Sequence, residues 1–191
     1  MQAIYDFLYD PGIPLKTMGF VIGLWLILSH GFALVKPDLV GTQLKAFPRN
    51  ENLGIPMVIF GFVWAFILWS CMDLGEFFKI ERPVQVIIIG VCVGVIIHVK
   101  EFIAVRALGF IMILAAAPIL ESAFLKEPQS RLLIVALAYI MAVKGMFWVG
   151  MPYLMRDQIN WVLADKKRFA LAAIAGIIYG VLVLSAAILY W

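Results

Sequence analysis

The chain has 191 residues, of which 64% are hydrophobic and 14% are charged, and its mean hydropathy is +1.02. A soluble domain is about half apolar and about one quarter charged, so this composition excludes a soluble globular domain and indicates that lipid is the main solvent. The net charge of +3 is small, and the basic residues lie in loops and at helix ends, so we expect no nucleic-acid partner. Only Cys71 and Cys92 are present, so neither a disulfide framework nor a CxxC metal site is available.

Six apolar runs approach the ~20 residues that cross a bilayer as a helix. They predict an all-α integral membrane protein with six transmembrane helices, forming a single membrane domain over residues 1–191. The third and fourth runs form a hairpin whose bend carries Lys100, Glu101 and Arg106. The expected spans are 18–35, 53–72, 84–99, 102–123, 132–151 and 169–191.

Shorter segments between the spans place apolar residues at helical spacing among polar ones, a pattern typical of amphipathic helices that lie in the membrane interface. Two such interfacial helices are expected at 38–47 and 153–163. A short interfacial helix or arm is expected at 4–9, before Pro11 and Gly12 break the run.

The basic residues divide unequally between the two ends of the predicted spans. Five lie on the side that holds the N-terminus: Lys16, Lys79, Arg82, Lys126 and Arg131. Nine lie on the other side: Lys36, Lys45, Arg49, Lys100, Arg106, Arg156, Lys166, Lys167 and Arg168. The positive-inside rule makes the second side cytoplasmic and puts both termini outside. The expected location is the bacterial inner membrane, with both termini in the periplasm.

A faint internal repeat relates spans one and two to spans five and six. A shift of 115 residues aligns Phe32 with Phe147, Pro37 with Pro152, Leu39 with Leu154, Gln43 with Gln158, Ile59 with Ile174 and Gly61 with Gly176. Each copy then consists of a spanning helix that ends at a proline, an interfacial helix and a second spanning helix. Corresponding helices of the two copies cross the membrane in the same direction. A rival shift of 90 aligns 16–20 with 106–110 and relates helices of opposite direction.

Two histidines fall at similar depth on helices that run in the same direction, His30 in the first span and His98 in the third. Glycines lie near each of them on the helix surface, at Gly19 and Gly23 and at Gly90 and Gly94. This arrangement is what a b-type haem with two histidine ligands requires, because glycines leave room for the porphyrin. The alternative is that the glycines pack helices together and each histidine hydrogen-bonds across the contact.

Lys144 is the deepest charge, about 13 residues into the fifth span. We expect its partner to be Glu101 at the hairpin bend, with Asp157 second. One hypothesis is a protonatable or anion-binding group on a polar path. The alternative is a lysine that reaches the interface or holds the hairpin in place by an ion pair.

No GxSxG, P-loop, HExxH or Rossmann motif is present, so no catalytic or metal-binding residue is assigned and an enzyme is not expected. We expect a non-catalytic subunit of a larger membrane complex, energy-transducing or electron-transferring, with bound lipid and with other membrane subunits or a second copy as partners. One alternative is a small repeat-built transporter or channel with Lys144 in its path. Another is a subunit that binds b-type haem or pigment through His30 and His98.

Overall fold

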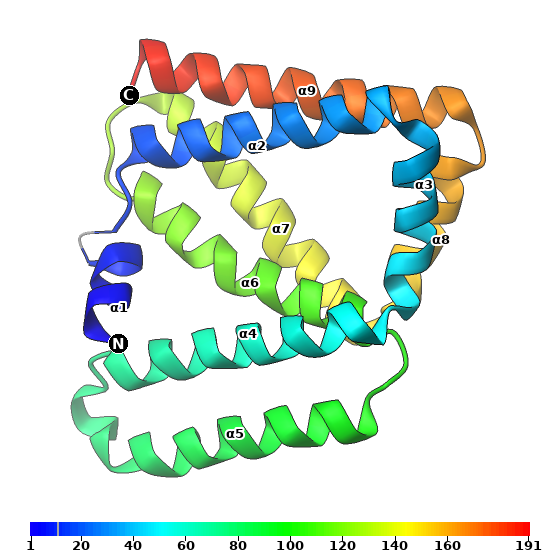
Figure 1. Ribbon diagram of the computed structural model, residues 1–191. Coiled ribbons are helices and arrows are strands. Elements are labelled where there is room, and N and C mark those ends of the chain that lie inside the picture. The colour runs from blue at the N-terminus through cyan, green and yellow to red at the C-terminus, as the bar shows by residue number, and fades with distance from the viewer. Residues whose placement is uncertain (11) are drawn as a thin grey trace.

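The computed structural model describes residues 1–10 and 12–191 and is helical almost throughout (Figure 1). Six helices are long and apolar enough to span a membrane, which confirms the all-α class and the six candidate spans. They are α2 (Leu15–Val35), α4 (Glu51–Cys71), α5 (Glu81–His98), α6 (Ile103–Ala123), α7 (Leu132–Gly150) and α9 (Lys166–Leu189).

Shorter helices lie in the segments that the sequence predicts to be interfacial. They are α1 (Gln2–Tyr9), α3 (Pro37–Ala46) and α8 (Tyr153–Leu163), with 3-10 turns η1 (Phe47–Arg49), η2 (Gly75–Ile80) and η3 (Gln129–Arg131). Their helical form agrees with the prediction, while their place in a membrane interface stays a prediction. Pro11, at which the sequence predicts the end of the first segment, lies outside the described residues.

Local sequence explains where several helices begin. Pro37 lacks the N–H that would continue α2, and it occupies the first turn of α3, where that N–H is not needed. The Asn50 side chain accepts a hydrogen bond from the Leu53 N–H (3.1 Å), and the Asp165 side chain accepts one from the Lys167 N–H (2.9 Å). Because these caps satisfy free N–H groups, α4 and α9 begin slightly before the predicted boundaries at 53 and 169.

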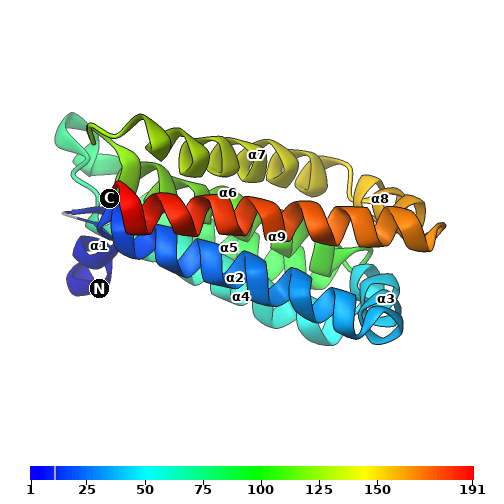
Figure 2. The same ribbon diagram turned by 90° about the horizontal axis from the view of Figure 1, so that it is seen from above.

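The long helices alternate in direction, so both chain termini lie at the same end of the molecule, and α3 and α8 lie at the other end (Figure 1). Helix α2 packs along α9, α6 packs along α7, and α4 packs between α5 and α6. Seen from above, α2 and α9 lie side by side in front of α4, α5 and α6, and α7 runs beside α9 (Figure 2). The fold therefore groups two helices against a row of four.

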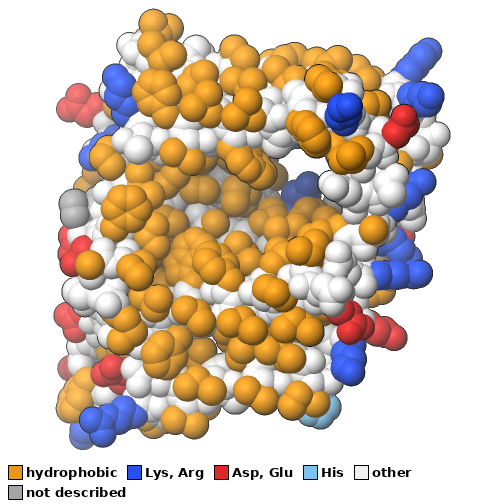
Figure 3. Space-filling view, viewed as in Figure 1, with side chains coloured by type: hydrophobic (Ala, Val, Ile, Leu, Met, Phe, Trp, Pro, Cys, Tyr) orange, Lys and Arg blue, Asp and Glu red, His pale blue; other side chains and the backbone are white. Residues whose placement is uncertain are grey.

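Two clusters of buried side chains join the long helices to one another and to α8. The larger cluster joins α2 and α9 to α6 and α7, and its buried members are Leu15, Met18, Ala116, Ile119, Ala123, Ile134, Ala138 and Val183. The second joins α6 and α7 to α8, and its buried members are Val105, Trp148, Met155 and Ile159. Between the α2–α9 pair and the helices below it, the molecular surface is hollowed (Figure 3).

Large hydrophobic side chains are exposed along the sides of the long helices, while most charged side chains gather at the two ends (Figure 3). Trp25, Leu28, Val86 and Leu171 are each at least 60% exposed. Such a surface is unfavourable in water and favourable in a hydrocarbon layer bounded by headgroups. The surface is thus consistent with contact with a lipid bilayer.

The order of elements is the same in two parts of the chain. Helices α2, α3 and α4 form one series of long, short and long helices, and α7, α8 and α9 form another. Helices α3 and α8 also pack against each other. This order is compatible with the shift of 115 residues, and the duplication itself stays a prediction.

Candidate functional site

His30 lies in the contact between α2 and α9. Its Nδ1 is 2.9 Å from the Leu26 carbonyl oxygen, which accepts the hydrogen bond, and the ring lies against Gly176 of α9. A Cβ at Gly176 would collide with the imidazole ring, so the glycine makes room for His30. The side chain also lines a cavity of about 320 Å³ with Trp25 and Phe169. This geometry matches the packing role that the sequence offered as the alternative to haem ligation.

His98 lies at the last residue of α5, and its side chain is exposed. Its Nδ1 donates to the Gly94 carbonyl oxygen at 3.1 Å. Because α5 packs on α4 while α2 packs on α9, the two histidines belong to helices at opposite edges of the molecule (Figure 1). The structure therefore does not bring His30 and His98 together, and it offers no support for a haem held between them.

The four glycines assigned to helix packing divide into two pairs. Gly19 lies against Trp191 and Ala187, and a Cβ at Gly23 would lie 3.1 Å from the Gly180 carbonyl oxygen, so both are positioned for the contact between α2 and α9. In contrast, a Cβ at Gly90 or Gly94 would meet no other atom within 4 Å. The second pair therefore lies on a face of α5 that nothing in the described chain covers.

The face of α5 that carries these glycines is apolar and exposed. Val86 and Ile97 lie within about 40° of Gly90 around the helix at 100° per residue, and they are 70% and 58% exposed. No residue of α5 is buried. We call Val86, Gly90, Gly94 and Ile97 the α5 outer face.

Lys144 does not meet either of its expected partners. The Lys144 Nζ lies 5.2 Å from the centre of the Trp148 ring, in a cation–π contact. Asp157 instead pairs with Arg156 at 2.9 Å, the one ion pair within the described ranges 1–10 and 12–191. Glu101 is exposed and lines a cavity of about 430 Å³ together with Arg156. The ion pair proposed between Lys144 and Glu101 is therefore absent from the part of the chain that the structure describes.

Arg106 has a role that the sequence did not predict. Its Nη1 donates to the Val149 carbonyl oxygen at 2.8 Å, so α6 places a cation at the C-terminal end of α7, where the helix dipole is negative. Arg106 Nε and Trp148 Nε1 are buried donors with no partner among the described residues. Leaving two buried donors without an acceptor is energetically costly.

At the end that holds the termini, α1 is attached to α4 by a polar contact between aromatic residues. Trp64 Nε1 donates to the Tyr9 hydroxyl at 3.1 Å, and the Tyr5 ring packs against Tyr9. Burial raises the pKa of the Tyr9 phenol, because the charged phenolate is disfavoured away from water. The neutral phenol is therefore part of the contact that holds α1.

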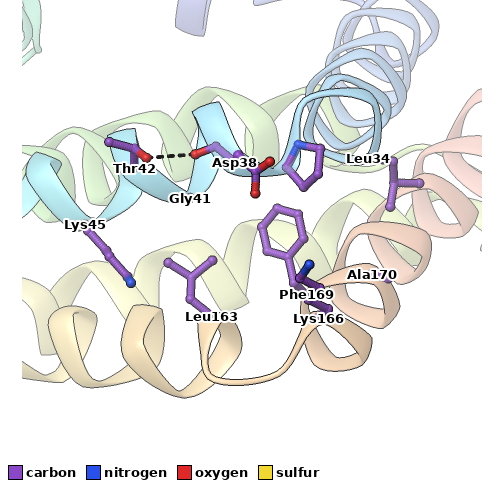
Figure 4. Close-up of a pocket in the computed structure, with 10 residues that line it drawn as sticks. Leu34, Asp38, Gly41, Thr42, Lys45, Leu163, Lys166, Phe169 and Ala170 are labelled. Atoms are coloured by element: carbon purple, nitrogen blue, oxygen red, sulfur yellow. Dashed lines mark hydrogen bonds between the residues drawn. The ribbon is translucent and has the colours of Figure 1, made fainter.

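A cavity with both polar and apolar walls lies between α3 and the adjoining ends of α8 and α9 (Figure 4). Its volume is about 480 Å³, and we call it the α3–α8 pocket. It is lined by Leu34, Pro37, Asp38, Gly41, Thr42, Lys45, Leu163, Lys166, Phe169 and Ala170. No pattern in the sequence predicts this pocket, because it depends on α3 and α8 lying side by side.

Within residues 1–10 and 12–191, no group of three or more His, Cys, Asp or Glu side chains is close enough to hold a metal ion. The fold and these sites define the class of an all-helical protein with six helices able to span a membrane, consistent with an integral membrane protein. Comparison with models of protein families, with curated proteins and with solved structures found no match.

Proposed function

We propose that the protein is a non-catalytic subunit of a larger membrane complex. The proposal rests mainly on the exposure of α5. This helix has the length and hydropathy of a membrane span, but none of its residues is buried in the described chain. A spanning helix that packs mainly along one other long helix leaves most of its surface to lipid or to another protein. The α5 outer face supports the second of these.

Glycines four residues apart let two helices approach until their backbones touch, and this contact replaces the hydrophobic effect, which does not drive helices together in lipid. The same chain uses the principle between α2 and α9, which carry the glycine pairs Gly19 and Gly23 and Gly176 and Gly180, and where a Cβ at Gly23 would lie 3.1 Å from the Gly180 carbonyl oxygen. Gly90 and Gly94 are also four residues apart, but no helix of the described chain packs against them. A helix of another subunit on the α5 outer face would supply it.

The test is purification of the tagged protein from its native membranes in mild detergent, with mass spectrometry of the accompanying chains. We expect another membrane protein to co-purify with the unaltered protein. It should not co-purify with the Gly94→Leu variant, because leucine prevents the close approach of a second helix. Gly31→Leu is the matched control, since Gly31 also has no atom near its Cβ position but lies on α2. If every accompanying protein is recovered equally with both variants, the proposal is refuted. If the only accompanying protein is a second copy of this chain, the protein forms a homo-oligomer and the proposal is also wrong.

A second candidate, a small transporter or channel, is supported by the surroundings of Lys144. Its ammonium group has no carboxylate partner among the described residues, and the neighbouring Trp148 Nε1 donor is unsatisfied. Lys144 is exposed, and an exposed cation without a carboxylate partner suits an anion that moves along a polar path. Lys144→Ala should then abolish anion flux into vesicles that contain the purified protein. This candidate would be excluded if the unaltered protein gave no anion flux, or if the Lys144→Ala variant gave the same flux as the unaltered protein.

A further inference from the structure

The α3–α8 pocket combines two kinds of wall. Leu34, Leu163, Phe169 and Ala170 form apolar walls, and the amines of Lys45 and Lys166 lie on opposite elements at its rim (Figure 4). Leu34 belongs to the last turn of α2, while Phe169 and Ala170 belong to the first turns of α9. The pocket therefore joins the apolar ends of two candidate spans to a basic rim.

Neither Lys45 nor Lys166 is neutralised by a carboxylate of the described residues. Among the ion pairs formed by the described residues, none contains Lys45 or Lys166. Asp38 is the one acidic residue that lines the pocket, so the lining carries one net positive charge. That charge complements the single negative charge of a phosphodiester.

We propose that the α3–α8 pocket binds the headgroup of an anionic phospholipid, with the phosphodiester between Lys45 and Lys166 and the start of the acyl chains against Leu34 and Phe169. Basic pockets at the ends of membrane spans suit such headgroups. The volume of about 480 Å³ lies in the range of small-molecule sites, roughly 300–1,000 Å³. A free phosphate ion would leave the apolar walls without a contact, which is why the structure favours a lipid.

A second cavity extends the apolar part of the site. It has a volume of about 320 Å³, and it shares Phe169 with the α3–α8 pocket. Trp25, Ala33 and Ala172 are among its lining residues and lie further along α2 and α9. A lipid whose headgroup occupies the first cavity therefore has an apolar surface for its chains along the same two helices.

The test is native mass spectrometry of the full-length protein in detergent during titration with phosphatidylglycerol or phosphatidylcholine. We expect one phosphatidylglycerol molecule to be retained in preference to phosphatidylcholine. Each lysine near a phosphate contributes about fivefold in affinity, so replacing Lys45 and Lys166 together by glutamine should weaken binding about 30-fold. Replacing both by arginine should preserve binding, because the charges remain.

The matched control replaces Lys36 and Lys167 by glutamine. It removes the same charge at the same end of the molecule without touching the pocket lining. Far-ultraviolet circular dichroism verifies that each variant keeps its helices. The assignment would be overturned if the two double-glutamine variants lost lipid binding equally. It would also be overturned if replacing Lys45 and Lys166 by glutamine caused no loss of lipid binding. Displacement of the lipid by millimolar inorganic phosphate would overturn it in favour of a phosphate-ion site.

Discussion

The contact between α6 and α7 depends on two glycines, so enlarging one of them should destabilise the fold measurably. A Cβ at Gly145 would lie 2.5 Å from the Gly109 carbonyl oxygen and 2.9 Å from Ile113 Cγ1. Ordinary contact begins near 3.4 Å, so the helices would have to separate by about 1 Å. Because backbone cannot move aside as a side chain can, we expect Gly145→Ala to cost about 1–3 kcal/mol of unfolding free energy.

The assay is unfolding of the purified protein in mixed micelles with increasing sodium dodecyl sulfate, followed by circular dichroism. The expected cost shifts the unfolding equilibrium about 5- to 150-fold. Gly31→Ala is the matched control, because no atom lies within 4 Å of its Cβ position. Alanine there should leave stability unchanged or raise it by about 0.5–1 kcal/mol. Coincident unfolding curves for the two variants would refute a close α6–α7 contact at these glycines.

Three further predictions concern individual side chains. Burial of Tyr9 favours the neutral phenol in the folded state and raises its pKa, so its contribution to stability is full below about pH 10 and falls as the pH rises through the raised pKa. Tyr9→Phe should reduce this alkaline loss of stability in thermal unfolding, and an unchanged loss would contradict the burial of Tyr9. Asn50→Ala should lower the unfolding free energy by about 1 kcal/mol by removing the α4 cap, measured in the same micelle titration. The visible spectrum of the purified protein should contain no Soret band that His30→Ala or His98→Ala abolishes, because these residues lie on helices that do not pack together.

The number and approximate position of the long helices could be predicted because lipid imposes a strong condition on sequence. A helix that crosses hydrocarbon must satisfy its own backbone and remain apolar for ~20 residues, so composition alone reveals it. Pro37 and Asn50 add local stop and start signals that the structure uses. Which end of the molecule is cytoplasmic stays a prediction from the basic residues.

The lateral arrangement of the helices could not be predicted in the same way. Counting residues at 1.5 Å rise gives His30 and His98 a similar depth, but depth does not say which helices are neighbours. Likewise, Lys144 contacts the face of Trp148, four residues further along its own helix, and not the carboxylate of Glu101. Its position along the span does not say which side chains lie beside it. The α3–α8 pocket and the reach of Arg106 to α7 arise from contacts between segments about 40 or more residues apart in sequence, which no local pattern encodes.

Photo-crosslinking in native membranes tests the role of the α5 outer face most directly. A photoreactive amino acid at Ile97 samples that face, and one at Leu28 samples an exposed position on α2. We expect Ile97 to give an adduct with the mass of a second protein chain, and Leu28 to give lipid adducts. Lipid adducts alone from both positions would contradict an interface on α5 and, with it, the proposed place of this protein in a larger complex.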